Sequence, residues 1–470
     1  AREGGGDVAN RAPFRGVPER ELALAASIEG VLPEWLAGDL LRTCPAVFRR
    51  GKWEARHWFD ALGMLYQFRV AGGSVSYRQR LMETETSRAI RDGDVSHTSF
   101  GTPTRRGLFS RLRSPVPAST DNVNVNVVAL GGDRVALTES PHQWIVDAET
   151  LALTARVRYE DGQGELGMIA HPHYDFARDR VVSLGIRLGR RTHVVLYEHA
   201  PSSRERSIVG TIDLRRLPYI HSFGLTPRHA VVIGHPFEVN PLTLLASNRG
   251  FIDHFRWRPE QGTRLWLIDR HTGAVRQHTA PAGFVFHVVN AFEDAEHTCI
   301  DLVLFPDPDI VERLRTSQLA TRGFPEVQPS IVRWTMRPGV EAAQSEVLLA
   351  QGFEFPVVSY RKCSGQRYRL AFGARIRAGG GALRGALVRL DLESGERSFE
   401  REGFVFGEPT FVGRPGAEEE DDGVLLSVGS HVSESRSAMV VLDARSLDQR
   451  AWAEVPFPIP LGFHGSFFRA

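Results

Sequence analysis

Short runs that alternate apolar and polar residues or are rich in β-branched residues recur along the whole of this 470-residue chain, and they limit its class of fold more than any other feature. Examples are MLYQFRV, RVVSLGI, HAVVIG, RLWLID and SAMVVLD, each bounded by Gly, Pro, Asp or Asn. A period of two residues is typical of a β-strand, and runs of this length between turn residues indicate a sandwich, barrel or propeller. Long helical periodicity is scarce, so we expect an all-β protein.

A recurring turn divides these strands into units. A strand runs into an Asp that is followed three residues later by Thr or Ser, in DAET, DRHT, DLES and DARS at Asp147, Asp269, Asp391 and Asp443. Such an Asp accepts hydrogen bonds from the backbone that follows it. Together with Asp213 in TIDL, the intervals suggest units of roughly 50 to 65 residues, which is the length of a four-stranded propeller blade, and about seven fit the chain. Turns of this kind also occur in other β-rich proteins.

Composition excludes several classes of protein. The 57 Lys and Arg nearly balance the 56 Asp and Glu, so a dedicated nucleic-acid surface is not expected. The three cysteines have no paired spacing, which argues against disulfides and indicates a reducing compartment. No apolar run approaches the ~18 residues of a spanning helix. We expect one propeller domain over residues 1–470, with a flexible segment over 1–20 and a cytoplasmic location, unless a leader has been removed.

Four histidines stand among apolar or small residues at strands or strand edges, at His171 in IAHPHYD, His221 in YIHSFGL, His287 in FVFHVVNA and His464 in GFHGSFF. If the unit length is right, they lie on different blades, and the inner strands of successive blades line one axis. Four imidazoles that converge on an axis indicate a metal site. Each histidine has a structural alternative, and alternation alone does not choose between His171 and His173.

Three glutamates stand beside hydrophobic strands, at Glu139 in ALTESP, Glu354 in GFEFPVV and Glu408 in FGEPTFV. A carboxylate is costly to bury without a partner. A carboxylate that accepts the distal N–H of a ligating histidine fixes the tautomer of that histidine and offsets the charge of the metal. The three glutamates are therefore candidates for this role, although an exposed or edge position would explain each of them singly.

These residues occur in an order that resembles the carotenoid cleavage dioxygenases. The motifs run from GDLLRTCPAVF and HWFDALGMLYQF through FGTP, TDNVNVNVV, LTE, AHPHYD, IHSFGLT, FHVVNAFED, EFP and GEPTFV to the terminal GFHGSFF. They look most like the branch that contains the β-carotene oxygenases and the retinal pigment epithelium isomerohydrolase. The resemblance implies a seven-bladed propeller with one Fe(II) per chain on its axis, His171 rather than His173 as a ligand, and the three glutamates behind the ligands.

The resemblance also implies a reaction. Members of this family use O2 to cleave a double bond of a carotenoid into two carbonyl products, such as apocarotenals or retinal, in a tunnel formed by loops and short helices that cap the propeller. By resemblance, Phe59, Phe100, Thr138 and Phe286 face the iron or the tunnel and contact the substrate. The alternatives are cleavage of an apocarotenoid or a stilbene, retinoid isomerohydrolase activity, and a non-enzymatic scaffold. Thr138 stands where stilbene-cleaving members typically have Lys, which favours a carotenoid.

Since carotenoids dissolve in membranes, we expect the tunnel mouth to touch lipid without spanning it. Two segments mix apolar and basic residues in the required way, RRGLFSRLRS at 105–114 and NPLTLLASNRGFIDHF at 240–255. The alternative is that they pack their apolar residues into the body of the protein. We therefore expect a peripheral, monotopic association with a membrane.

Overall fold

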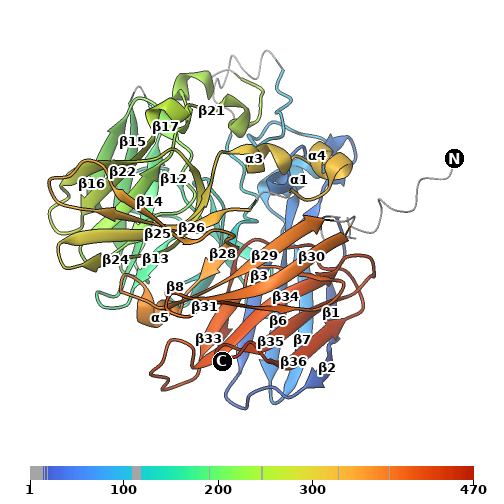
Figure 1. Cartoon of the computed structure of the whole chain (residues 1–470). Coiled ribbons are helices and arrows are strands. Elements are labelled where there is room, and N and C mark those ends of the chain that lie inside the picture. The colour runs from blue at the N-terminus through green and yellow to red at the C-terminus, as the bar shows by residue number, and fades with distance from the viewer. Residues whose placement is uncertain are drawn as a thin grey trace.

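Seven antiparallel sheets of four to six strands follow one another along the chain in the computed structural model. Their arrangement is that of a seven-bladed propeller, as the sequence predicted (Figure 1). The structure describes residues 14, 16–17, 19–107, 118–189, 191–244, 247–325, 328–379 and 382–470.

Each blade extends outwards from an inner strand at the axis. In that order, the first three blades are β37 (Gly465–Arg469), β3 (Gly38–Val47), β6 (Leu62–Ala71), β7 (Ser74–Leu81) and β1 (Leu22–Ala25); β8 (Asn126–Leu130), β9 (Asp133–Leu137), β10 (Gln143–Val146) and β11 (Leu153–Arg156); and β12 (Gly167–Met168) with β13 (His173–Asp175), β14 (Arg180–Arg187), β15 (Thr192–His199) and β16 (Ser207–Leu214). The fourth and fifth are β18 (Gly224–Leu225), β19 (His229–Gly234), β22 (Thr263–Asp269) and β23 (Val275–Ala280); and β24 (Phe284–Asp294), β25 (His297–Phe305), β26 (Ser330–Met336) and β27 (Gln344–Leu349). The last two are β28 (Glu354–Val357), β29 (Leu370–Gly379), β30 (Ala382–Asp391) and β31 (Gly395–Glu400); and β32 (Phe404–Phe406) with β33 (Thr410–Gly413), β34 (Gly423–His431), β35 (Ser437–Asp443), β36 (Gln449–Val455) and β2 (Ser27–Gly30).

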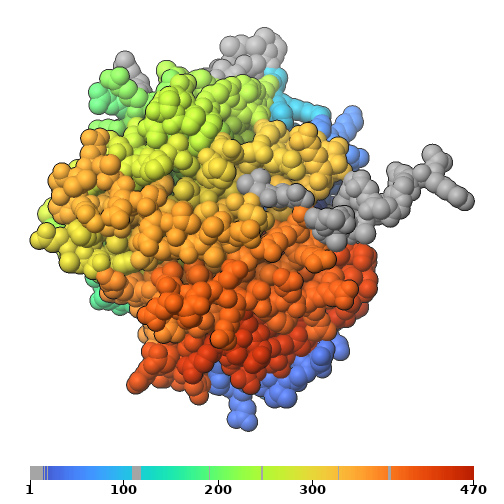
Figure 2. All heavy atoms as spheres, viewed as in Figure 1, coloured from blue at the N-terminus to red at the C-terminus, as the bar shows by residue number. Residues whose placement is uncertain are grey.

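Both ends of the chain close the ring. The C-terminal strand β37 pairs with β3 and forms the inner strand of the first blade, so that Gly38 faces Arg469. The N-terminal strand β2 pairs with β36 at the outer edge of the last blade, so that Ser27 faces Glu454. Figures 1 and 2 show the blue N-terminal strands lying against the red C-terminal ones. A residue next to β37 therefore lies close to the axis although it is almost at the end of the chain.

The recurring Asp turn is confirmed at all four positions. In DAET, Asp147 Oδ1 accepts hydrogen bonds from the Thr150 amide at 2.7 Å and the Glu149 amide at 3.1 Å. The Asp turns at 269, 391 and 443 use the same two backbone donors. Each of the four turns joins the last two strands that its part of the chain adds to a blade, and in the seventh blade the N-terminal strand β2 then pairs outside β36. Asp213 is an exception to the predicted repeat, because it lies inside β16 and pairs with His193.

A cap of short elements covers one end of the propeller (Figure 1). It consists of α1 (Glu85–Arg91), α3 (Asp309–Arg313), α4 (Thr316–Arg322), η2 (Trp58–Asp60), η3 (Pro241–Leu244), η4 (Phe251–His254) and η5 (Pro259–Gln261), with the small sheets β4 (Arg49–Arg50) and β5 (Trp53–Glu54), and β17 (Leu217–Pro218), β20 (Phe237–Val239) and β21 (Arg256–Trp257). One further helix, α5 (Tyr360–Cys363), follows β28. None of the helices among the described residues is long and apolar enough to cross a bilayer.

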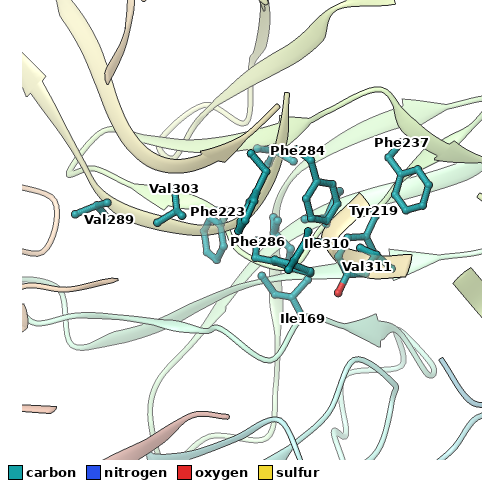
Figure 3. Packing of buried hydrophobic residues seen from close by; sticks show 14 of the residues in the cluster. Ile169, Tyr219, Phe223, Phe237, Phe284, Phe286, Val289, Val303, Ile310 and Val311 are labelled. Atoms are coloured by element: carbon teal, nitrogen blue, oxygen red, sulfur yellow. The ribbon is translucent and has the colours of Figure 1, made fainter. Parts of the chain in front are cut away.

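The largest hydrophobic cluster joins the cap to blades three to six. Its aromatic centre gathers Tyr219, Phe284 and Phe286 beside Ile310 and Val311 of α3 (Figure 3). Full burial of a side chain of this size contributes about 2 kcal/mol to stability. This cluster fixes the short cap helices, which have few turns of their own to stabilise them.

Two predicted segments lie largely outside the described residues. Of the expected flexible segment 1–20, the structure describes only the last few residues, where Phe14 stacks on Phe324 with the ring centroids 5.0 Å apart and Glu19 pairs with Arg50. Of the expected lipid-facing segment 105–114, only residues 105–107 are described. The three cysteines are buried and unpaired, in agreement with the sequence prediction that they form no disulfide.

Candidate metal centre

The four histidines singled out in the sequence meet at one point of the propeller. Each of His171, His221, His287 and His464 offers one ring nitrogen, and these four nitrogens all lie within 4.8 Å of one another. His171 lies between β12 and β13, His221 just before β18, His287 inside β24, and His464 immediately before β37. Inner strands of different blades deliver these side chains because those strands converge on the axis.

Irregular backbone aims these side chains. His287 lies between Val285 and Val288, where the register of the β24–β25 pair shifts, and neither His287 nor Phe286 has a partner in the ladder. A bulge of this kind turns a side chain out of the alternating pattern. His171 and His221 lie in the breaks before short inner strands, where the backbone is free of ladder constraints.

The three glutamates stand behind three of the histidines. The Nδ1 atom of His287 lies 2.5 Å from Glu354 Oε2, that of His464 lies 2.7 Å from Glu408 Oε1, and that of His221 contacts Glu139. A carboxylate in this position accepts the Nδ1 proton, which leaves the Nε2 lone pair directed away from it. The Nε2 atoms are the ones that face one another at the centre.

The spacing of the Nε2 atoms fits a metal ion. His171 Nε2 lies 3.0 Å from His221 Nε2, and His287 Nε2 lies 3.1 Å from His464 Nε2. Since the Nδ1 protons of His287 and His464 are engaged by carboxylates, two lone pairs oppose each other at 3.1 Å, and only a cation between them makes that contact favourable. Two imidazole ligands at ~2.1 Å and at right angles around one ion are about 3.0 Å apart.

Burial favours the neutral form of two of the imidazoles, which is the form that binds metals. Burial, reinforced by the neighbouring imidazoles, holds the pKa of His171 well below its usual range, and the pKa of His464 is lowered in the same way. Burial also raises the pKa of Glu408, an effect that the Arg42 guanidinium opposes. Neutral imidazoles surrounded by carboxylates form a donor set that attracts a cation.

Three further residues hold the glutamates in place, and the sequence did not single them out. Arg42 of β3 lies 3.0 Å from Glu408 Oε2, and the Tyr219 hydroxyl donates a hydrogen bond to Glu139 Oε2 at 3.1 Å. The Phe355 amide donates to Glu354 Oε2 at 2.9 Å, and Phe355 has a φ of 55°, a strained conformation for a residue other than glycine. The sequence offered one signal for each of two of these residues. Arg42 is a charged residue within the apolar run DLLRTC, and Tyr219 lies two residues before His221, on the same face.

A row of alternating asparagines in TDNVNVNVV organises the centre from the side of β8. Asn126 donates to the Ala170 carbonyl at 2.8 Å, next to His171, and Asn124 donates to the Phe59 carbonyl at 3.0 Å. Between them, the Val125 carbonyl accepts from the His464 amide at 3.0 Å. The strand therefore ties together backbone that comes from both ends of the chain.

A cavity of about 690 Å³ opens onto the centre. His221, His287 and His464 line it, and so do all four residues expected to contact substrate, Phe59, Phe100, Thr138 and Phe286. A volume of this size is ordinary for a small-molecule site, and the lining is largely aromatic and aliphatic. The structure therefore brings the four predicted contact residues to one surface beside the histidines.

The aromatic residues of the cavity form a contiguous wall. The Phe59 ring lies 5.1 Å from that of Phe100 and 6.1 Å from that of Phe286, while Phe286 lies 5.8 Å from His221. The buried Asp60 carboxylate accepts a hydrogen bond from the Phe100 amide at 2.7 Å, which fixes the loop that carries this ring.

A second, smaller cavity of about 190 Å³ lies on another side of the centre and is lined by His171, His464 and Glu408. His173 also lines it, but its ring nitrogens are engaged elsewhere, 2.9 Å from the Tyr360 hydroxyl and 2.9 Å from the Phe223 carbonyl. Of the two histidines that alternation left open, the structure places His171 in the cluster and His173 outside it.

The chain is similar in sequence to proteins of known activity. The sequence model described as retinal pigment epithelial membrane protein matches residues 14–469. The mitochondrial carotenoid-cleaving dioxygenase of Mustela putorius furo is 30% identical, with 96% of this chain and 95% of that protein covered. The beta,beta-carotene 15,15'-dioxygenase of Rattus norvegicus is 28% identical, with coverages of 94% and 89%.

Solved structures share the fold over nearly the whole chain. Cobalt-substituted Synechocystis ACO superposes with a TM-score of 0.85 at 24% identity, and 98% of each chain is covered. A chimera of ACO and RPE65 gives the same TM-score and coverage at 25% identity. The first of these proteins holds a metal in the same fold.

Proposed function

The chain belongs to the carotenoid cleavage dioxygenase family and is an oxidoreductase that cleaves carotenoids, and from that premise we propose that it uses one Fe(II), held by His171, His221, His287 and His464, to cleave a polyene double bond of a β-carotene-like substrate with O2. The observation that carries the proposal is the meeting of four imidazoles, three of which line a largely apolar cavity. The family is metal-dependent, and this donor set suits a divalent ion.

The overall reaction is balanced by the substrates alone. One C=C bond and one O2 are consumed, and two C=O groups are formed, so that no reductant is needed. A bound ferrous ion with four protein ligands supplies the redox chemistry that lets ground-state O2 react with a closed-shell alkene. The protein supplies no nucleophile or acid to the reaction; its residues choose the bond and exclude water.

Glu139, Glu354 and Glu408 keep the ligands in one tautomer. Each accepts the Nδ1 proton of its histidine, and therefore the Nε2 atom of that ring remains available at the centre. In this proposal they are positioning residues, and two of them, Glu139 and Glu354, also line the large cavity.

The cavity wall selects the bond. Phe59, Phe100 and Phe286 form the face along which a long polyene lies, and Thr138 adjoins Glu139 at the same end of the cavity. Holding one double bond beside the centre converts the encounter into an intramolecular one, which is the largest contribution that a purely apolar site can make. Aromatic faces also stabilise the positive charge that develops on the polyene.

We further propose that the mouth of the cavity meets a lipid surface. The exposed residues that line the cavity include Leu188, which is about half exposed, together with Arg187, Arg249 and Glu165. Leu242 of η3, in the segment 240–255, is 62% exposed. Apolar side chains flanked by basic ones are the arrangement of a monotopic contact, and a carotenoid would then pass from the bilayer to the cavity without crossing water.

Metal analysis and product analysis test the activity. The full chain is prepared anaerobically, its iron is measured, and it is mixed with β-carotene in detergent under 18O2. We expect near one iron per chain and two carbonyl products, each with one labelled oxygen. The lengths of the products identify the bond. His221→Ala should lose both iron and products, whereas His278→Ala, which removes a buried histidine of β23 outside the centre, should keep both.

Two results would contradict the proposal. Iron with no carbonyl product from any carotenoid or apocarotenoid would reject carbon–carbon cleavage, and retinol released from a retinyl ester would favour the isomerohydrolase alternative. For the lipid contact, flotation with liposomes should fall in Leu188→Glu and Leu242→Glu but not in Val347→Glu, which changes an exposed apolar residue of β27. Equal flotation of all three variants would refute it.

A further inference from the structure

Arg42 lies fully buried in the interior next to the centre, 1% exposed, where a charge is costly without a partner. One guanidinium nitrogen, NH2, contacts the Phe463 carbonyl at 2.6 Å and Glu408 Oε2 at 3.0 Å, and the other, NH1, contacts the Thr410 hydroxyl at 3.4 Å. The guanidinium thus touches the backbone beside His464 and the carboxylate behind that histidine. Arg42 is not among the described residues that line the large cavity, so it takes no part in holding the substrate.

The three glutamates of the centre differ in their second partner. Glu139 receives a neutral hydroxyl from Tyr219, and Glu354 receives a backbone amide. Among the ion pairs of the described residues, only Glu408 of the three is also paired with an arginine. Its Oε1 atom lies 2.7 Å from His464 Nδ1, and its Oε2 atom forms the ion pair with Arg42 at 3.0 Å.

We propose that Arg42 is a positioning residue that sets the charge of the ion the centre retains. An imidazole binds a metal as a neutral ligand, so the formal charges of the three carboxylates and one guanidinium around the four histidines add up to −2. A divalent ion cancels this charge and a trivalent ion leaves an excess of +1. Because residual charge in a low-dielectric interior is unfavourable, Arg42 favours the ferrous over the ferric ion.

The size of the effect follows from the separation of the charges. At roughly 10 Å and an effective dielectric constant of about 20, one unit charge changes the ferric-to-ferrous ratio on the order of tenfold. Removal of the Arg42 charge should therefore favour the ferric ion, and removal of the Glu408 charge should favour the ferrous ion. The inference rests on the proposed function only in taking the bound metal to be iron.

A charge cycle on the iron-loaded full chain tests the proposal. The variants are Arg42→Gln, Glu408→Gln and the double variant. The readout is the ferric share of bound iron at one fixed potential, measured by electron paramagnetic resonance. The potential is set in a mediated titration in which dithionite reduces Fe(III) to Fe(II). We expect the ferric-to-ferrous ratio to rise about tenfold in Arg42→Gln, to fall by more than that factor in Glu408→Gln, because Glu408 lies nearer the centre, and to lie between the two single variants in the double variant.

Several results of this experiment would contradict the proposal. A ratio within about threefold of wild type in Arg42→Gln with iron retained, or shifts of the same sign in both single variants, would overturn the proposal. If Arg42→Gln retains no iron, Arg42→Lys decides: iron kept by Lys supports a role for the charge, and iron lost from both shows that only the shape of Arg42 matters. A wild-type chain that holds no iron would instead refute the proposed function.

Discussion

Gly465→Ala should break the metal centre from the backbone side. Gly465 follows His464 directly and faces Arg42 across the β3–β37 pair. A Cβ at this position would lie 2.2 Å from the Leu41 carbonyl oxygen and 2.7 Å from Arg42 Cα. Neither atom is the end of a flexible side chain, so the strands themselves must separate.

The magnitude follows from these contacts. A carbon normally approaches a carbonyl oxygen to about 3.3 Å, so the strands must move apart by about 1 Å. Overpacking of this kind costs about 1 to 3 kcal/mol, and a weakened pair of ladder hydrogen bonds adds about 1 kcal/mol. We expect a loss of about 3 kcal/mol in the free energy of unfolding. His464, which shares this backbone, would be displaced by a similar distance, enough to remove one ligand from its position.

Iron content and urea unfolding measure the two consequences separately. Gly465→Ala should retain less than half of the wild-type iron and unfold at a lower urea concentration. The matched control is Gly132→Ala in the β8–β9 turn, where a Cβ would meet nothing within 4 Å; it should stay within about 0.5 kcal/mol of wild type. If Gly465→Ala kept full iron and the wild-type midpoint, the close approach of β37 to β3 would not be what positions His464.

Three further outcomes follow from the same geometry. His464→Ala should abolish iron retention and cleavage while circular dichroism keeps the β signature, because the side chain contributes to the centre more than to the core; wild-type iron in this variant would exclude it as a ligand. Chelation of the metal should lower the melting temperature of the wild type, and added Fe(II) should restore it, since removal leaves lone pairs of His287 and His464 opposed at 3.1 Å. Burial lowers the pKa of His57 to about 3, so between that pH and about pH 6.5 only the unfolded chain binds a proton on this imidazole. The free energy of unfolding should therefore be about 2 kcal/mol lower at pH 5 than above pH 6.5. A His57→Gln variant with the same pH dependence of stability as the wild type would contradict this assignment.

Much of the fold could be predicted from the sequence, because the signals for strands and turns are local. Alternation marked the strands, and the Asp turns at Asp147, Asp269, Asp391 and Asp443 marked the junction of the last two strands in four blades. The prediction of a turn at Asp213 was wrong, because a strand that ends in IDL has the same sequence pattern whether or not a hairpin follows. The predicted number of seven blades is still correct, because the length of one unit and the length of the chain together limit how many blades fit.

Only part of the candidate metal centre could be predicted from the sequence. Histidines and glutamates in apolar contexts stood out because burial of such groups requires a reason. The choice of His171 over His173 rested on a resemblance, and in the structure it depends on which ring nitrogens find other partners. Arg42 and Tyr219 went unnoticed, because their partners lie 366 and 80 residues away in the chain and no local pattern records such a pairing.

The sequence by itself determined the class of fold, the units that repeat and the residue types able to bind a metal, because each of these depends on neighbours a few positions apart. Only the tertiary structure decided that the two termini share the first and last blades with these pairings, and that Arg42 meets Glu408 beside the axis. These are contacts between segments hundreds of residues apart. They arise when the ring closes, and closure is a property of the packed blades as a whole.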